Sequence, residues 1–115
     1  MIRRGEELRS DTVEKRLGGK GKFKVVNILE PEQMRDKASA FSRVVFPPGS
    51  SIGYHQHTDD AEVYYIIKGE GQVSDNGTLV TVSAGDMAFC PIGDSHSIEN
   101  TGHENLEFIA LKLLA

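Results

Sequence analysis

Short apolar runs separated by turn-forming residues make up most of the chain after residue 22. Runs rich in Val, Ile, Leu and Phe end at clusters of Gly, Asp, Asn and Pro, at intervals of about 8–12 residues, as in antiparallel sandwiches and barrels. Asn76-Gly77 is a strong β-hairpin dipeptide. This pattern predicts an all-β fold, a small antiparallel β-barrel. We expect its strands at Phe23–Leu29, Phe41–Phe46, Ile52–His57, Glu62–Lys68, Gly71–Asp75, Leu79–Ser83, Met87–Cys90, Ser95–Glu99 and Leu106–Leu114.

The first 22 residues lack this pattern. They are polar and glycine-rich, so we predict a loosely held arm over residues 1–22, with one helical turn around Thr12–Leu17, before a barrel domain over residues 23–115. A second short helix is expected over Glu30–Ala38, because Pro31 suits the first turn of a helix. The total of 115 residues suits a single domain.

Composition excludes several classes of protein. The longest apolar run, Val63–Ile67, is far shorter than the ~20 residues of a membrane-spanning helix, and no apolar stretch follows the basic start as in a secretory signal. The single cysteine, Cys90, excludes an internal disulfide. We therefore expect a cytoplasmic protein. Residues 1–43 carry a net charge of +4 and residues 44–115 a net charge of −8, but acids interrupt the basic residues, which argues against nucleic-acid binding.

Three of the four histidines fall into one arrangement with a carboxylate. His55 and His57 are two residues apart, so on a strand both imidazoles point to the same face. Glu62 begins the next strand and His96 begins a later one, so a closing sheet can bring all four together. Imidazoles with one carboxylate suit a divalent transition metal such as Mn, Fe, Zn, Ni, Co or Cu. The alternative is that these are ordinary surface or core histidines.

Around these residues the sequence resembles the cupin superfamily, in particular its small single-domain bacterial members. The first cupin motif, G-x5-H-x-H-x4-E-x6-G, is matched by Gly49, His55, His57, Glu62 and Gly69. The second, G-x5-P-x-G-x2-H-x3-N, is matched by Gly85, Pro91, Gly93, His96 and Asn100. The resemblance implies a jelly-roll barrel (double-stranded β-helix) with His55, His57, Glu62 and His96 as metal ligands.

The resemblance leaves the reaction open, because cupins include dioxygenases, decarboxylases, isomerases, lyases and binding proteins. Oxalate decarboxylases of the family carry an arginine three positions before the first ligand histidine, where this chain has Ile52. Cupin thiol dioxygenases usually lack the ligand glutamate, which is present here as Glu62. We expect a small carboxylate, enediol or sugar-acid-like substrate at the metal. The alternative is a non-enzymatic module that binds or senses a small ligand.

Two further residues are candidates for a role in catalysis. Arg43 could hold an anionic substrate if it points inward, and otherwise it is a solvated surface residue. Tyr64 shares a strand face with Glu62 and could move a proton, unless it only packs in the core. Met87 and Phe89 are expected to pack inside the barrel. The resemblance also suggests a homodimer, in which Phe23–Leu29 would add to the partner's sheet.

Overall fold

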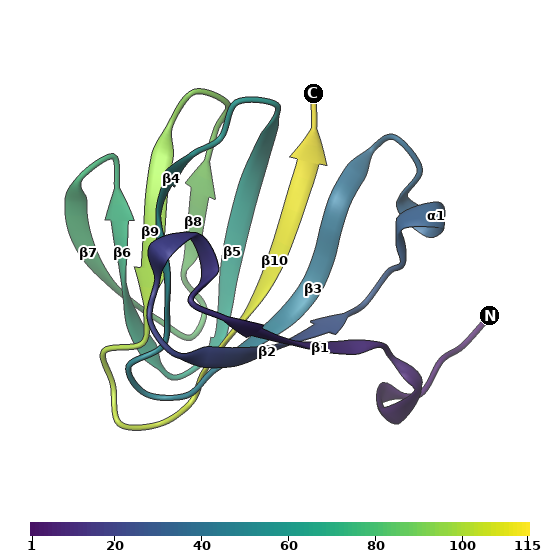
Figure 1. Ribbon diagram of the computed structural model, residues 1–115, viewed down its shortest axis with the longest axis horizontal. Coiled ribbons are helices and arrows are strands. Elements are labelled where there is room, and N and C mark those ends of the chain that lie inside the picture. The colour runs from purple at the N-terminus through teal and green to yellow at the C-terminus, as the bar shows by residue number, and fades with distance from the viewer.

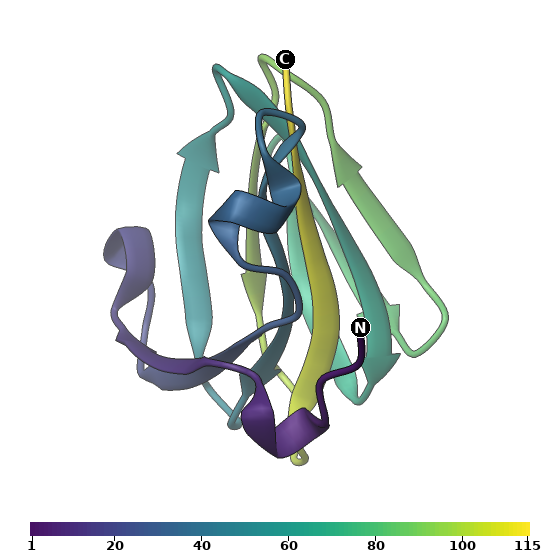
Figure 2. The same cartoon turned by 90° about the vertical axis from the view of Figure 1, so that its right-hand side faces the viewer.

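Two antiparallel β-sheets face each other in the computed structural model, which describes all 115 residues (Figures 1 and 2). The larger sheet has the strand order β1-β2-β3-β10-β5-β8. These strands are β1 (Ser10–Glu14), β2 (Lys22–Asn27), β3 (Ala38–Phe46), β10 (Leu106–Leu114), β5 (Asp60–Lys68) and β8 (Met87–Cys90). The smaller sheet, of order β4-β9-β6-β7, consists of β4 (Ser51–Gln56), β9 (Ser95–Glu99), β6 (Glu70–Asp75) and β7 (Thr78–Ser83). The prediction of an all-β barrel of jelly-roll type is confirmed.

Inward-facing side chains of both sheets form one apolar core. Phe46 lies at its centre, with its ring centroid 4.7 Å from that of Phe23 and 5.1 Å from that of Phe108. Ile66 and Ile98 are completely buried and join the same cluster. The core fills one part of the space between the sheets, and the polar residues of the candidate site lie beside it.

The N-terminal segment differs from its expected form. Residues 10–14 form β1, which pairs with β2 from Ser10 opposite Val26 to Glu14 opposite Lys22. The predicted helical turn is replaced by this strand and by a 3-10 turn, η2 (Arg16–Gly18), because pairing with a strand distant in sequence outweighs local helix propensity. A second 3-10 turn, η1 (Gly5–Glu7), precedes β1.

The helix expected over Glu30–Ala38 is shorter than predicted. It spans only α1 (Pro31–Met34), and Arg35 follows with a φ of 58°, a conformation that cannot continue a helix. The chain then enters β3 at Ala38, three residues before the predicted start of that strand. None of the helices has the length and apolar character needed to cross a membrane.

Met87 and Phe89 do not pack inside the barrel, contrary to expectation. They lie opposite Tyr65 and Val63 in the β5–β8 ladder, so their side chains share the outer face of the larger sheet. Met87 is 61% and Phe89 49% exposed. On β8 it is Ala88, opposite the buried Tyr64, that faces inward.

Candidate metal centre

Three elements bring the four predicted ligands together. His55 is on β4, Glu62 on β5 and His96 on β9, while His57 follows the end of β4. One potential ligand atom from each residue lies within 4.8 Å of all the others. His57, Glu62 and His96 are buried, and His55 is half-buried.

A β-bulge aims His55 at this cluster. Ile52 lies opposite Ile98, and His55 lies opposite His96, so three steps on β4 correspond to two on β9. The extra residue restores the inward direction of His55, as bulges commonly do beside functional sites. His57 is held by backbone hydrogen bonds, because its N–H donates to the Asp94 carbonyl (3.0 Å) and its carbonyl accepts from the N–H of Gly93 (2.7 Å).

The donor atoms converge at short range. The Nε2 atoms are 3.1 Å apart for His55 and His57, 2.8 Å for His57 and His96, and 3.2 Å for His96 and His55. Glu62 Oε1 lies 3.2 Å from Nε2 of His57 and 3.3 Å from Nε2 of His96. Ligands about 2.1 Å from a metal lie about 3.0 Å apart at right angles and about 3.4 Å apart in a tetrahedron. The observed separations are close to these values, so the four residues fit a metal ion.

The opposite ring nitrogens explain why a cation fits between the histidines. Nδ1 of His55 lies 2.6 Å from the carbonyl oxygen of Gly53, and Nδ1 of His57 lies 2.5 Å from a carboxylate oxygen of Asp60. A carbonyl and a carboxylate only accept, so both Nδ1 atoms carry the proton. In neutral His55 and His57 the two Nε2 atoms therefore present lone pairs to each other at 3.1 Å. A metal ion between them turns this repulsion into attraction.

The electrostatics of the cluster favour the forms that bind metals. Burial alone would raise the pKa of Glu62, but a hydrogen bond with His96 and the positive charge of Lys112 lower it overall. Burial lowers the pKa of His55, which favours the neutral imidazole. A carboxylate and neutral imidazoles are the forms that coordinate cations.

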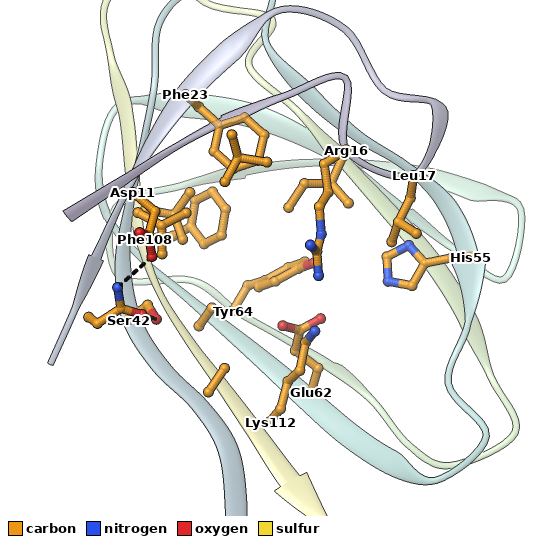
Figure 3. Close-up of a pocket in the computed structure, with 17 residues that line it drawn as sticks. Asp11, Arg16, Leu17, Phe23, Ser42, His55, Glu62, Tyr64, Phe108 and Lys112 are labelled. Atoms are coloured by element: carbon orange, nitrogen blue, oxygen red, sulfur yellow. Dashed lines mark hydrogen bonds between the residues drawn. The ribbon is translucent and has the colours of Figure 1, made fainter. Parts of the chain in front are cut away.

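Beside the cluster lies a cavity of about 210 Å³. Its wall is apolar on one side, where Phe23 and Phe108 contribute, and polar on the other, where His55 and Glu62 face inward (Figure 3). Arg16, Tyr64 and Lys112 also line it. A space of this size with a few converging polar groups is typical of a small-molecule site.

Tyr64 lines the cavity together with Glu62, as expected for two residues that share one face of a strand. Its ring stacks on His96 with centroids 4.9 Å apart and planes inclined by only 4°. Its hydroxyl lies 3.5 Å from His96 Nε2. Burial and the charge of Glu62 raise the pKa of Tyr64 well above its usual value, so the phenol stays protonated and can donate a hydrogen bond.

Arg43 does not line the cavity. Its guanidinium is paired with Glu107 at 2.9 Å on the outer face of the larger sheet. Its neighbour Ser42 faces the cavity instead, because successive side chains of a strand alternate. The structure therefore corrects the expectation that Arg43 holds an anion.

Three polar residues of the site were not identified from the sequence. Asp60 accepts a hydrogen bond from Nδ1 of His57, the ring nitrogen that faces away from the cluster. Its position three residues after that histidine could have indicated this contact. Lys112 lies directly opposite Glu62 in the β5–β10 ladder, a position that becomes visible only once the register is known. Arg16 comes from the segment expected to be a loose arm.

The fold and the cluster together define a small β-barrel protein with three histidines and one glutamate gathered beside a cavity. The family model described as "Cupin domain" matches residues 42–112. The chain therefore belongs to the cupin family.

The similarity to known proteins extends over nearly the whole chain. An "Oxalate-binding protein" of Thermotoga maritima is 45% identical over 114 residues, covering 99% of this chain and 94% of that protein. A crystal structure of a "predicted oxalate decarboxylase" from the same organism has a TM-score of 0.95 at 44% identity and covers 100% of both chains. The polyketide cyclase RemF of Streptomyces resistomycificus shares the fold alone, with a TM-score of 0.79 at 16% identity over 98% of this chain and 80% of that one.

Proposed function

We propose that this protein holds one divalent transition metal at His55, His57, Glu62 and His96, and that it binds a small carboxylate anion there. The observation that carries the proposal is the convergence of four donor atoms: the three histidine Nε2 atoms lie 2.8–3.2 Å apart, and Glu62 Oε1 lies 3.2–3.3 Å from two of them. When bound, the metal would act as a Lewis acid and as a template that orients the carboxylate.

The charges around the cavity support an anionic ligand. Arg16 and Lys112 line it, and neither has an ion-pair partner in the protein. The carboxylate of Asp11 also lines the cavity, where it pairs with Arg9, a residue that also pairs with Glu30. A divalent ion with Glu62, Asp60, Arg16 and Lys112 would give a net charge of +2, which a small dianion balances. Oxalate is such a dianion, and the Thermotoga maritima relative is named for binding it.

Binding accounts for the site better than decarboxylation does. Ile52 lines the cavity at the position where the oxalate decarboxylases of the family carry an arginine. Turnover is a second candidate, and Tyr64 is the observation in its favour. Its protonated hydroxyl, beside His96, is positioned to donate a hydrogen bond or a proton to a bound anion.

The experiment compares metal content and oxalate binding in the wild type, His96→Ala and His103→Ala. His103 is an exposed histidine outside the cluster, so its variant is the matched control. We expect about one metal ion per chain in the wild type and in His103→Ala and none in His96→Ala. Calorimetry with oxalate should show binding only to the metal-loaded proteins. Equal oxalate binding by His96→Ala and the wild type would refute the proposal.

Product analysis separates binding from turnover. Incubation of the metal-loaded wild type with oxalate should leave the oxalate unchanged if the protein only binds it. Release of formate or carbon dioxide, lost in Tyr64→Phe while oxalate affinity is kept, would establish turnover instead and give Tyr64 its role.

We also propose a homodimer, formed through the outer face of the larger sheet. β2 already pairs with β1 and β3 of its own chain, so the Phe23–Leu29 segment has no free edge to offer. Tyr65, Ile67, Met87 and Phe89 are each at least 40% exposed on neighbouring strands. These four side chains form an uncharged patch, which a two-fold axis would bury against its copy. Ultracentrifugation should show a dimer that Met87→Glu dissociates; a monomeric wild type would refute it.

A further inference from the structure

The turn that carries Arg16 has an unusual backbone. Lys15 and Leu17 both have positive φ angles, 50° and 51°, and Gly18 follows at 81°. The left-handed conformation costs a residue other than glycine about 1 kcal/mol or more. Two such residues flank Arg16 directly, and strain of this kind persists only where the surrounding structure imposes it.

Close backbone contacts hold this turn against β4. A Cβ atom on Gly53 would lie only 2.0 Å from the carbonyl oxygen of Leu17, and a Cβ atom on Gly19 only 2.1 Å from that of Ser51. Two hydrogen bonds join Lys20 to Ser51 at the same place: the Ser51 N–H donates to the Lys20 carbonyl (2.9 Å), and the Lys20 N–H donates to the Ser51 hydroxyl (2.8 Å). The turn is therefore docked on the barrel.

The docked turn also contacts a residue that is hydrogen-bonded to one of the four proposed metal ligands. Gly53, which the turn touches through Leu17, accepts the Nδ1 hydrogen bond of His55 at 2.6 Å. One residue thus contacts both the segment that carries Arg16 and a predicted metal ligand. This contact sets where the backbone at Arg16 lies relative to the cluster.

Arg16 extends into the cavity from the turn, and Lys112 enters it from β10 (Figure 3). Both charged ends point toward Glu62, yet neither forms an ion pair with it within 4.0 Å. Glu62 is already within 3.3 Å of two histidine nitrogens. The only other basic residue after Arg43 is Lys68, which lies 3.9 Å from Glu107 on the outer face. The two cations of the cavity are thus free to bind a ligand.

We infer that Arg16 and Lys112 form a subsite for the carboxylate oxygens that face away from the metal ligands, so that the cavity selects small dicarboxylates over monocarboxylates. This inference rests on the proposed function and adds a specificity-determining residue to it. Arg16 supplies the directional part, because a guanidinium donates two parallel hydrogen bonds to a carboxylate. Lys112 supplies a point charge.

The test compares oxalate with glyoxylate, which has nearly the same size but one negative charge fewer. Calorimetry on the metal-loaded protein gives both affinities for the wild type, Arg16→Gln, Arg16→Lys and Lys15→Gln. Lys15 is the adjacent cation and does not line the cavity, so Lys15→Gln is the matched control. Metal content and thermal unfolding are measured on each variant.

We expect Arg16→Gln to weaken oxalate binding by about 10- to 100-fold, the usual effect of losing a charge-assisted bidentate contact. Its glyoxylate affinity should fall by much less, and its metal content should stay unchanged. Arg16→Lys should be intermediate, and Lys15→Gln should match the wild type. Arg16→Gln with wild-type oxalate affinity would refute the subsite alone. A metal-loaded wild type that binds neither anion would refute the proposed function, and the subsite with it.

Discussion

Asp60 offers a sharp test of the metal centre, because it touches a proposed ligand without being one. Its carboxylate accepts the Nδ1 proton of His57 at 2.5 Å, and the two side chains are 21% and 5% exposed. In Asp60→Asn the amide oxygen can still accept that proton, so the tautomer of His57 is kept and only the negative charge is lost. The substitution therefore isolates the electrostatic support that the carboxylate gives to the imidazole.

Losing such support typically weakens metal binding 10- to 100-fold. Asp60 is partly reached by solvent, which screens its charge, so we expect the lower half of that range, about 10- to 30-fold. This corresponds to about 1.4–2.0 kcal/mol at about 1.4 kcal/mol per tenfold change. Asp60→Ala, which removes the hydrogen bond as well, should cost more.

The assay is competition with a fluorescent chelator for Mn²⁺ or Zn²⁺. Asp59→Asn is the matched control, since Asp59 is the exposed neighbouring acid and has no side-chain contact with the cluster. Thermal unfolding of the metal-free proteins should agree closely among the variants, and the stabilisation by added metal should be smaller in Asp60→Asn. Equal metal affinities for Asp60→Asn and Asp59→Asn would contradict this prediction.

Two further predictions concern parts of the fold that surround the site. Asn100 is 1% exposed and its side chain makes three hydrogen bonds, donating to the carbonyls of Phe46 and Glu104 and accepting from the N–H of Gly102. Asn100→Ala should therefore lower the free energy of unfolding by about 3 kcal/mol, measured by urea denaturation; a loss below 1 kcal/mol would contradict this. Cys90 is buried, and burial raises the pKa of its thiol to about 11. Because only the thiolate reacts, the native protein at pH 8 should react with a disulfide reagent far more slowly than the urea-unfolded chain, and equal rates would count against this.

Many strand limits could be predicted because they depend on residues that are close together in the sequence. The strands at Met87–Cys90, Ser95–Glu99 and Leu106–Leu114 have the predicted limits, since turn-forming residues directly precede each of them. The gathering of His55 and His57 was predicted from their spacing on one strand. In the structure β4 ends at Gln56, before His57, and a bulge that the sequence did not indicate directs His55 inward.

Which face of a strand is inward could not be predicted in the same way. The alternation on β3 separates Ser42 from Arg43, but only the pairing of Arg43 with Ile109 of β10 shows that the arginine lies outside. Met87 and Phe89 were misplaced for the same reason. An apolar side chain on an edge strand is compatible with the core and with an outer patch, and the register with β5 decides between them.

Arg16 shows the limit of motif-based reasoning most clearly. Its position depends on left-handed backbone at Lys15 and Leu17, residue types that give no sign of that conformation, and on a contact with Gly53 more than thirty residues away. The proposed metal ligands belong to the two cupin motifs, whereas the two basic residues of the cavity, Arg16 and Lys112, lie outside both motifs. Cupins that share the motifs can therefore share a metal centre and still differ in the anion they accept. In this chain, selectivity should follow from the turn at residues 15–19.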